Sequence, residues 1–203
     1  MKLYEYEAFP HPRRVRMFLA EKGLDVPRVQ VDVPAGEHRQ PAFLAKNPDG
    51  AVPVLELDGG ECITETTAIS RYFEEVQPKR PLFGESPESK AAIEMWQRRV
   101  EQSLMAAVGS YFHHATEGLG DAGRYRNRDW GEKNRETALE GMRSLNEQLA
   151  GNTYVAGADF SVADITALCA LDFAKALGIV IPEGCDSLRR WYEEVSARPS
   201  ASA

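Results

Sequence analysis

The order of apolar and polar positions divides the chain into two parts with different periodicity. In the first part, a β-prone run at 2–6 predicts a strand, and apolar residues three and four positions apart at 15–19 predict a helix. Pro12 suits the first turn of that helix, and Gly23 suits its end. Strict alternation over 28–33 predicts a second strand.

The remainder of the first part predicts a hairpin followed by a helix. The β-prone runs 52–57 and 61–63 are joined by the turn sequence Asp-Gly-Gly at 58–60, which favours a hairpin. Apolar residues at 69–76 then have the spacing of one helix face. The order β-α-β, a connection, then β-β-α indicates a small α/β domain over residues 1–78.

The second part of the chain has helical periodicity throughout. A proline-rich segment at 79–89 is predicted as a linker, and an all-helical domain follows over 90–203. Three amphipathic stripes each predict a helix; they cover 93–111, 139–149 and 188–195. Residues 162–177 are apolar nearly all round, which predicts the buried central helix of a bundle.

Composition narrows the class of protein. Of 203 residues, 43% are hydrophobic and 27% are charged, which excludes a disordered chain. The net charge of −7 argues against nucleic acid as a partner, since phosphate binding needs a basic face. No apolar run is long enough to span a membrane, and the first residues lack the apolar core of a signal peptide. Three distant cysteines predict neither a disulfide framework nor a metal site, so a reducing, cytoplasmic location is expected.

Three short motifs carry candidate chemistry. A cis bond before Pro53 would turn the backbone groups of Val52 toward an extended peptide ligand, whereas a trans proline would only open the strand. Residues 64–67, Thr-Glu-Thr-Thr, begin a helix whose free N–H groups suit a carboxylate, with the acid available for an ammonium group; ordinary helix capping is the alternative. Ser161 and Asp164 form a capping-box variant that sets where the buried helix begins.

Taken together and in this order, the motifs resemble those of the cytosolic glutathione S-transferase family over essentially the whole chain. The matching segments are Asn47-Pro48, Val52-Pro53-Val54-Leu55, Glu65-Thr66, Ser161-Val162-Ala163-Asp164, and the first-helix sequences at 12–16 and 21–24. The resemblance implies a thioredoxin-like domain followed by a helical bundle that carries the electrophile pocket. It also implies glutathione as co-substrate without a metal, a homodimer and a role in detoxification.

The resemblance also implies binding roles for individual residues. Val52 would pair its backbone with the cysteinyl part of glutathione beside a cis Pro53, and Glu65 and Thr66 would hold the γ-glutamyl end. The glycine carboxylate would meet His38, with Gln40 as the alternative. Many members have Lys or Arg at the position before Val-Pro, where this chain has alanine.

The residue that activates the thiol is the main departure from the family. Members normally place Tyr, Ser or Cys in the loop after the first strand, but residues 7–12 are Glu-Ala-Phe-Pro-His-Pro. Tyr6 and His11 are substitutes near that loop. The run at 111–120 resembles a bacterial and fungal subgroup in which a helical-domain histidine acts through water, which favours His114 and then His113.

Three functions follow from these residues as hypotheses. The first is a glutathione transferase that conjugates the glutathione thiolate to an electrophilic, largely apolar small molecule. The second is a non-catalytic glutathione-binding or interaction module of the same fold, suggested by the missing loop hydroxyl. The third, a thiol reductase, is disfavoured because no cysteine lies between Met1 and Glu61.

Overall fold

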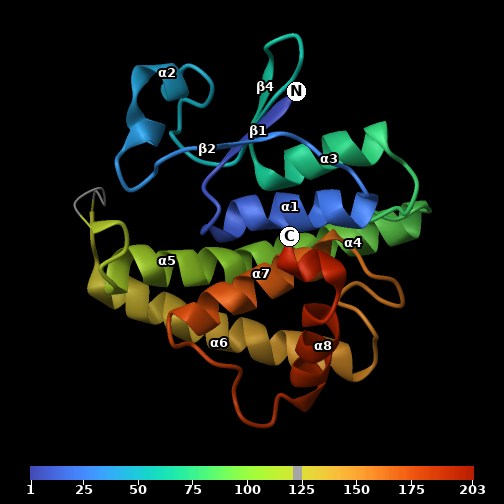
Figure 1. Cartoon of the computed structure of the whole chain (residues 1–203). Coiled ribbons are helices and arrows are strands. Elements are labelled where there is room, and N and C mark those ends of the chain that lie inside the picture. Colours follow the sequence, from blue (N-terminus) through green and yellow to red (C-terminus); the bar gives the residue numbers. More distant parts are fainter. Residues whose placement is uncertain (121–124) are drawn as a thin grey trace. The chain divides into compact units, whose positions relative to one another are not determined.

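The computed structural model describes residues 1–120 and 125–203 and divides into two compact units. The first unit comprises residues 1–80 with 202–203, and the second comprises 81–201. The first is a small mixed α/β unit and the second is helical (Figure 1). The predicted fold class, a thioredoxin-like domain followed by a helical domain, is confirmed.

A four-stranded mixed sheet forms the centre of the first unit. Its strands are β1 (Lys2–Glu5), β2 (Arg28–Gln30), β3 (Val54–Glu56) and β4 (Cys62–Ile63). Their order is β2-β1-β3-β4, with β1 parallel to β2 and the other two pairs antiparallel. In β1 and β3, Leu3 pairs with Leu55 and Tyr4 pairs with Val54, so each pair points to one face of the sheet.

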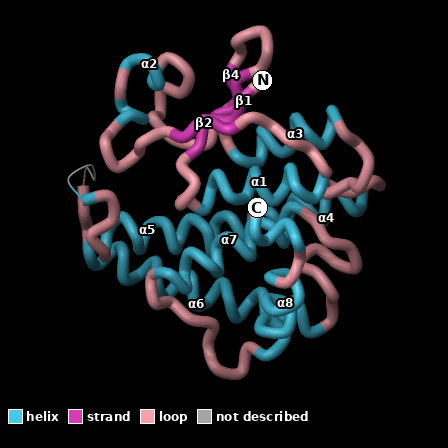
Figure 2. The backbone as a smooth tube through the Cα atoms, viewed as in Figure 1, coloured by secondary structure: helices cyan, strands magenta, loops and turns pink. Residues whose placement is uncertain are grey.

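Helices cover this sheet. They are α1 (Pro10–Lys22), α2 (Pro41–Leu44) and α3 (Thr66–Val76), with a 3₁₀ turn, η1 (Glu37–Arg39), before α2. Helices α1 and α3 lie side by side along one side of the sheet (Figure 2). Phe43 of α2 packs edge to face on Tyr4 at 6.4 Å between ring centroids and joins a buried cluster with Val54. The sheet is therefore apolar on both faces.

The second strand and the third helix differ in detail from the sequence prediction. The strand predicted at 28–33 is limited to β2, whose three residues are all exposed. Val31 and Val33 are buried instead beyond the strand, against Phe43 and Val54. In the last turn of α3, Val76 follows Ile69 by two helical turns on the same face but is 55% exposed, so the predicted apolar face is not buried at its end.

Buried ion pairs link the elements of the first unit. Arg16 on α1 pairs with Glu5 on β1 at 2.7 Å, and both side chains are almost fully buried. Lys22 at the end of α1 pairs with Glu74 on α3 at 2.5 Å and also donates to the carbonyls of Lys79 and Arg80. Because an unpaired buried charge is strongly destabilising, these pairs hold α1 to the sheet and to α3.

Within the described residues, the second unit contains five α-helices together with helical turns. They are α4 (Pro87–Val100), the π-helical turn η2 (Glu101–Met105), α5 (Ala106–Ala115), α6 (Arg128–Ala150), α7 (Val162–Ala176), α8 (Asp186–Ser196) and the 3₁₀ turn η4 (Pro199–Ser202), whose last residue belongs to the first unit. Residues 161–171 are all buried, which confirms the predicted central helix. Leu82 and Phe83, in the segment predicted as linker, are buried, and the carbonyl of Leu82 accepts from the Val162 amide. No helix in the described ranges has both the length and the apolar character to cross a membrane.

The start of α7 is the predicted capping box. The Asp164 carboxylate accepts from the amide and hydroxyl of Ser161, and it also accepts from the Val155 amide and the Trp191 indole at 2.9 Å each. The carboxylate is fully buried, and this burial raises the pKa of Asp164 to about 6 despite the four donors. This one side chain therefore joins α7, α8 and the segment before α7.

Candidate active site

The Val52–Pro53 peptide bond is cis, as the resemblance implied. The segment before it is held by Asn47, whose side-chain amide donates to the carbonyl of Ala51 at 2.8 Å. Within the described ranges, the amide and carbonyl of Val52 have no hydrogen-bond partner. Because backbone polar groups are seldom left unpaired, the strand-like edge at Val52 is suited to an extended peptide ligand.

The start of α3 lies beside this edge. The hairpin register pairs Leu55 with Ile63 and Glu56 with Cys62, so the chain that leads from β4 into α3 leaves the sheet at the Val54 end of β3, directly after Val52 and Pro53. Glu65 adopts φ +67°, a backbone conformation that L-residues rarely occupy and that is often found at functional sites. No side chain caps α3, so ordinary capping by the threonines does not occur here.

His38 and Gln40 lie in the turn that leads into α2. The His38 side chain is 3% exposed; its Nε2 accepts from Arg39 Nε at 3.2 Å, and its buried Nδ1 has no partner among the described residues. Burial and the neighbouring Arg39 charge lower the pKa of His38. Gln40 is exposed and makes no side-chain cap to α2. Because Nε2 accepts from Arg39, the proton of the neutral ring is on Nδ1. An anion near His38 would accept a hydrogen bond from this unpaired Nδ1–H.

The segment between β1 and α1 offers little to stabilise a thiolate. Tyr6 packs edge to face on Phe9 at 4.8 Å and belongs to the same apolar cluster as Val52. Prolines occupy the first and third positions of α1, so His11 supplies one of the few amides that this helix N-terminus can offer. The His11 side chain is exposed, with Nδ1 3.5 Å from the guanidinium of Arg14.

Sequence reasoning did not single out Arg14. Its side chain is buried and its NH2 group donates to Thr67 Oγ1 at 3.4 Å, which connects the start of α1 to the start of α3. The available signal was a basic residue in the second turn of α1, close to the helix N-terminus, where the helix dipole disfavours a cation. Arg14 therefore places positive charge where the two helices begin.

The two candidate histidines belong to α5 in the second unit. His114 Nδ1 accepts from the amide of Asn127 at 3.2 Å, which leaves Nε2 of the neutral ring as a hydrogen-bond donor. His113 packs against the neighbouring Phe112 ring at 5.0 Å, and desolvation, with a smaller contribution from His114, lowers the pKa of His113. The lowered pKa favours the neutral form of His113.

These features define a class of protein: a thioredoxin-like unit with a cis-proline edge beside an open helix N-terminus, followed by a helical unit with a capped buried helix. Residues 3–81 match the family "Glutathione S-transferase, N-terminal domain", and residues 101–199 match "Glutathione S-transferase, C-terminal domain". The chain belongs to the glutathione S-transferase family, and it is a glutathione transferase.

Individual relatives agree with this assignment. Glutathione S-transferase 2 of Saccharomyces cerevisiae is 44% identical over 98% of this chain and 87% of its own length. The crystal structure of Gtt2 from the same yeast has a TM-score of 0.97 and covers 100% of this chain and 99% of that chain. A glutathione S-transferase domain-containing protein from Marinobacter aquaeolei is 51% identical, also with a TM-score of 0.97, over 98% of this chain and 99% of that chain.

Proposed function

We propose that this enzyme binds glutathione along the Val52 edge and transfers its thiolate to an electrophilic, largely apolar small molecule. The observation that carries the proposal is the combination of a cis Val52–Pro53 bond before β3 with the positive φ of Glu65 at the start of α3. The backbone of Val52 pairs with the cysteinyl part of glutathione. Glu65 holds the ammonium of the γ-glutamyl end, and the free amides at Thr66 hold its carboxylate.

The glycine end of glutathione is assigned to His38. The unpaired Nδ1 of this buried histidine supports the assignment, because a carboxylate would provide the missing acceptor. The Nδ1 atom has almost no exposed surface, so a small movement of the turn accompanies binding. Gln40, which is exposed next to it, is the second candidate for this contact.

Activation of the thiol is assigned to His114, with His113 as the second candidate. A glutathione thiol with an ordinary pKa of about 8.5 is only a few per cent ionised at neutral pH, and lowering that pKa by about two units requires about 2.7 kcal/mol. Because His114 Nδ1 accepts from the Asn127 amide, Nε2 carries the N–H that donates to the thiolate or to a water beside it. Tyr6 and His11 are weaker candidates, since Tyr6 packs in an apolar cluster and His11 is exposed.

We further propose a homodimer that works in the cytoplasm and detoxifies electrophiles. Typical family behaviour supports the dimer and the location. In this proposal the enzyme binds glutathione and the electrophile and uses no metal.

Two measurements on the purified enzyme test this function. Isothermal titration with glutathione at millimolar concentrations is expected to show binding, and its absence would overturn the proposal. Turnover of 1-chloro-2,4-dinitrobenzene by His114→Ala is expected to fall about 10- to 100-fold in kcat with little change in the KM for glutathione. The pH midpoint of kcat/KM should also rise, because the thiolate loses a stabilising donor.

Matched histidine variants distinguish the candidates. His11→Ala, which removes an exposed imidazole from the other unit, is expected to retain turnover. If His113→Ala shifts the pH profile and His114→Ala does not, the role passes to His113. If neither variant moves the profile while glutathione still binds, the histidine part of the proposal is wrong and the binding part stands.

A further inference from the structure

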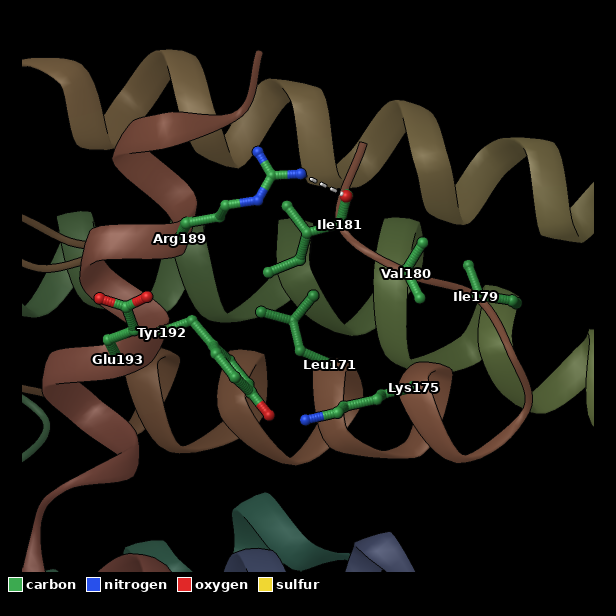
Figure 3. Close-up of a pocket in the computed structure, with 8 residues that line it drawn as sticks. All are labelled: Leu171, Lys175, Ile179, Val180, Ile181, Arg189, Tyr192 and Glu193. Carbon is green, nitrogen blue, oxygen red and sulfur yellow. Dashed lines mark hydrogen bonds between the residues drawn. The ribbon is translucent and has the colours of Figure 1, made fainter. Parts of the chain in front are cut away.

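A cavity of about 400 Å³ lies in the second unit between α7, the segment 179–181 and α8 (Figure 3). Its volume is in the range of cavities that hold small organic ligands. All of its lining residues lie between positions 171 and 193, so it contains none of the residues proposed to bind or activate glutathione.

The interior of the cavity is mostly aliphatic and aromatic. Leu171 on α7 and Ile181 in the connecting segment point toward each other in the middle of the cavity, and the Tyr192 ring from α8 faces them (Figure 3). Val180 at its edge is 66% exposed. Apolar surface that remains in contact with water at a concave site is stabilised when an apolar ligand covers it.

The walls of the cavity are held in place by hydrogen bonds. Arg189 donates to the carbonyls of Ile181 and Pro182 at 2.8 Å each, and it also pairs with Asp186 at 3.6 Å. The Tyr192 hydroxyl donates to the carboxylate of Asp172 at 2.5 Å, which fixes the plane of the ring. The cavity is therefore preformed, with the Arg189 charge paired with Asp186 and the Asp172 carboxylate accepting from the Tyr192 hydroxyl.

Lys175 supplies a positive charge that lacks an anion. Its ammonium group lies 5.7 Å from the Tyr192 ring centroid, and no carboxylate pairs with it among the residues that the structure describes. The Lys175 ammonium group projects into the cavity near the Tyr192 hydroxyl, whereas Glu193 on α8 lies at the other end of the cavity (Figure 3). The Lys175 end of the cavity thus favours a negatively charged group of a ligand. At the other end, the carboxylate of Glu193 disfavours a second negatively charged group.

We propose that this cavity is a second ligand site that takes aromatic monocarboxylates. The aromatic body lies between Tyr192 and the aliphatic pair Leu171 and Ile181, and the carboxylate pairs with Lys175. The geometry combines a large apolar contact with one charge-assisted contact, the usual composition of a small-molecule site. The site does not depend on the proposed catalytic role of His114.

The photoreactive aromatic acid 4-benzoylbenzoate is the probe for this site. Irradiation of the full-length enzyme with this acid, followed by peptide mapping, is expected to label the segment 171–193. Millimolar glutathione should leave the labelling unchanged. Binding measured by titration should weaken about fivefold in Lys175→Gln and less than about twofold in Lys175→Arg, since the arginine keeps the charge. Labelling that is confined to other segments would overturn the proposal.

Matched controls separate local charge from general effects. Lys133→Gln removes an exposed lysine on α6 and is expected to bind the acid like the wild type. Val180→Glu adds a negative charge at the cavity and should weaken binding, whereas Val76→Glu adds one on exposed α3 and should not. Equal affinity in wild type, Lys175→Gln and Val180→Glu would contradict the site. Raising the ionic strength from about 0.05 M to about 0.5 M should weaken wild-type binding more than Lys175→Gln binding.

Discussion

At the scale of single residues, Glu65 combines an unusual backbone conformation with a proposed role in binding glutathione. Its φ of +67° is disfavoured for any residue with a Cβ atom, and such strain costs of order 1–3 kcal/mol. A glycine at the same position avoids the strain, but neither glycine nor alanine supplies a carboxylate. Stability and ligand binding are therefore expected to respond differently to substitutions at this position.

Comparison of Glu65→Gly with Glu65→Ala tests this separation. Both variants should bind glutathione about 10- to 100-fold more weakly, because a charge-assisted contact is lost. Glu65→Gly should be more stable toward urea than Glu65→Ala by about 1 kcal/mol, because only glycine relaxes at positive φ. Equal stability of the two would mean that the backbone is not strained, and unchanged glutathione affinity would remove Glu65 from the binding site.

Local sequence predicts only some of the residues at the candidate site. The Asn47-Pro48 and Val52-Pro53 motifs led to the cis bond, which the structure confirms, only through the family resemblance; spacing alone left the trans form open. Arg14 was missed because helix propensity gives no reason for a buried cation near the start of a helix. Its partner Thr67 lies 53 positions away, and such a distant contact has no local signal.

At the scale of elements, Asp164 couples the start of α7 to α8. Its pKa of about 6 in the folded state lies above the ordinary value of 3.8, so the native protein holds a proton at pH values where the unfolded chain has lost it. The free energy of unfolding therefore falls as pH rises from about 4 to about 6, and this group contributes up to about 3 kcal/mol to that fall. Protonation remains compatible with the contact to Ser161, whose hydroxyl can accept as well as donate.

Urea unfolding of Asp164→Asn at several pH values tests this linkage. The variant should be less stable than wild type at pH 7 by about 1–3 kcal/mol, because its amide N–H₂ cannot accept from the Ser161 amide. The deficit should widen toward pH 4, where the wild type gains stability from its protonated acid. A constant difference across this range would show that Asp164 does not titrate there.

Two glycines let α6 approach its neighbours closely. A Cβ atom on Gly131 would lie 2.7 Å from the Ala115 nitrogen, and one on Gly141 would lie 2.7 Å from the Ser103 carbonyl in the π turn η2. Since Asn127 and Gly131 both meet the end of α5, this contact also positions His114. The close packing of α5 and α6 thus depends on residues without side chains.

Replacing Gly131 with alanine should force the two helices apart. The expected loss of stability is about 1–3 kcal/mol, with a smaller loss of turnover than in His114→Ala. Gly151→Ala is the matched control, because a Cβ atom there meets nothing within 4 Å and the residue has a negative φ. A Gly131→Ala protein as stable as Gly151→Ala would contradict the close contact.

At the scale of the whole molecule, the proposed homodimer gives a simple expectation. Sedimentation equilibrium should report about 45 kDa, twice the 22.6 kDa of the chain. The net charge of −7 per chain adds repulsion between subunits, so the dimer should be tighter in moderate salt than at low ionic strength. A mass of one chain across the micromolar range would rule the dimer out.

The sequence by itself determined the division into an α/β part and a helical part, the buried α7 with its capping box, and the family. These features follow from periodicity and from residues within a few positions of one another, where side-chain chemistry and backbone geometry are directly linked. The apolar run of α7 is the clearest case, because a helix that is apolar on all sides has to be buried.

Only the tertiary structure decided the positive φ of Glu65, the π turn in the stripe at 93–111, the exposure of Val76 and the cavity beside Lys175. Each depends on contacts between segments far apart in the chain. The packing energy of such contacts overrides local preference, and a single sequence read by periodicity does not contain it.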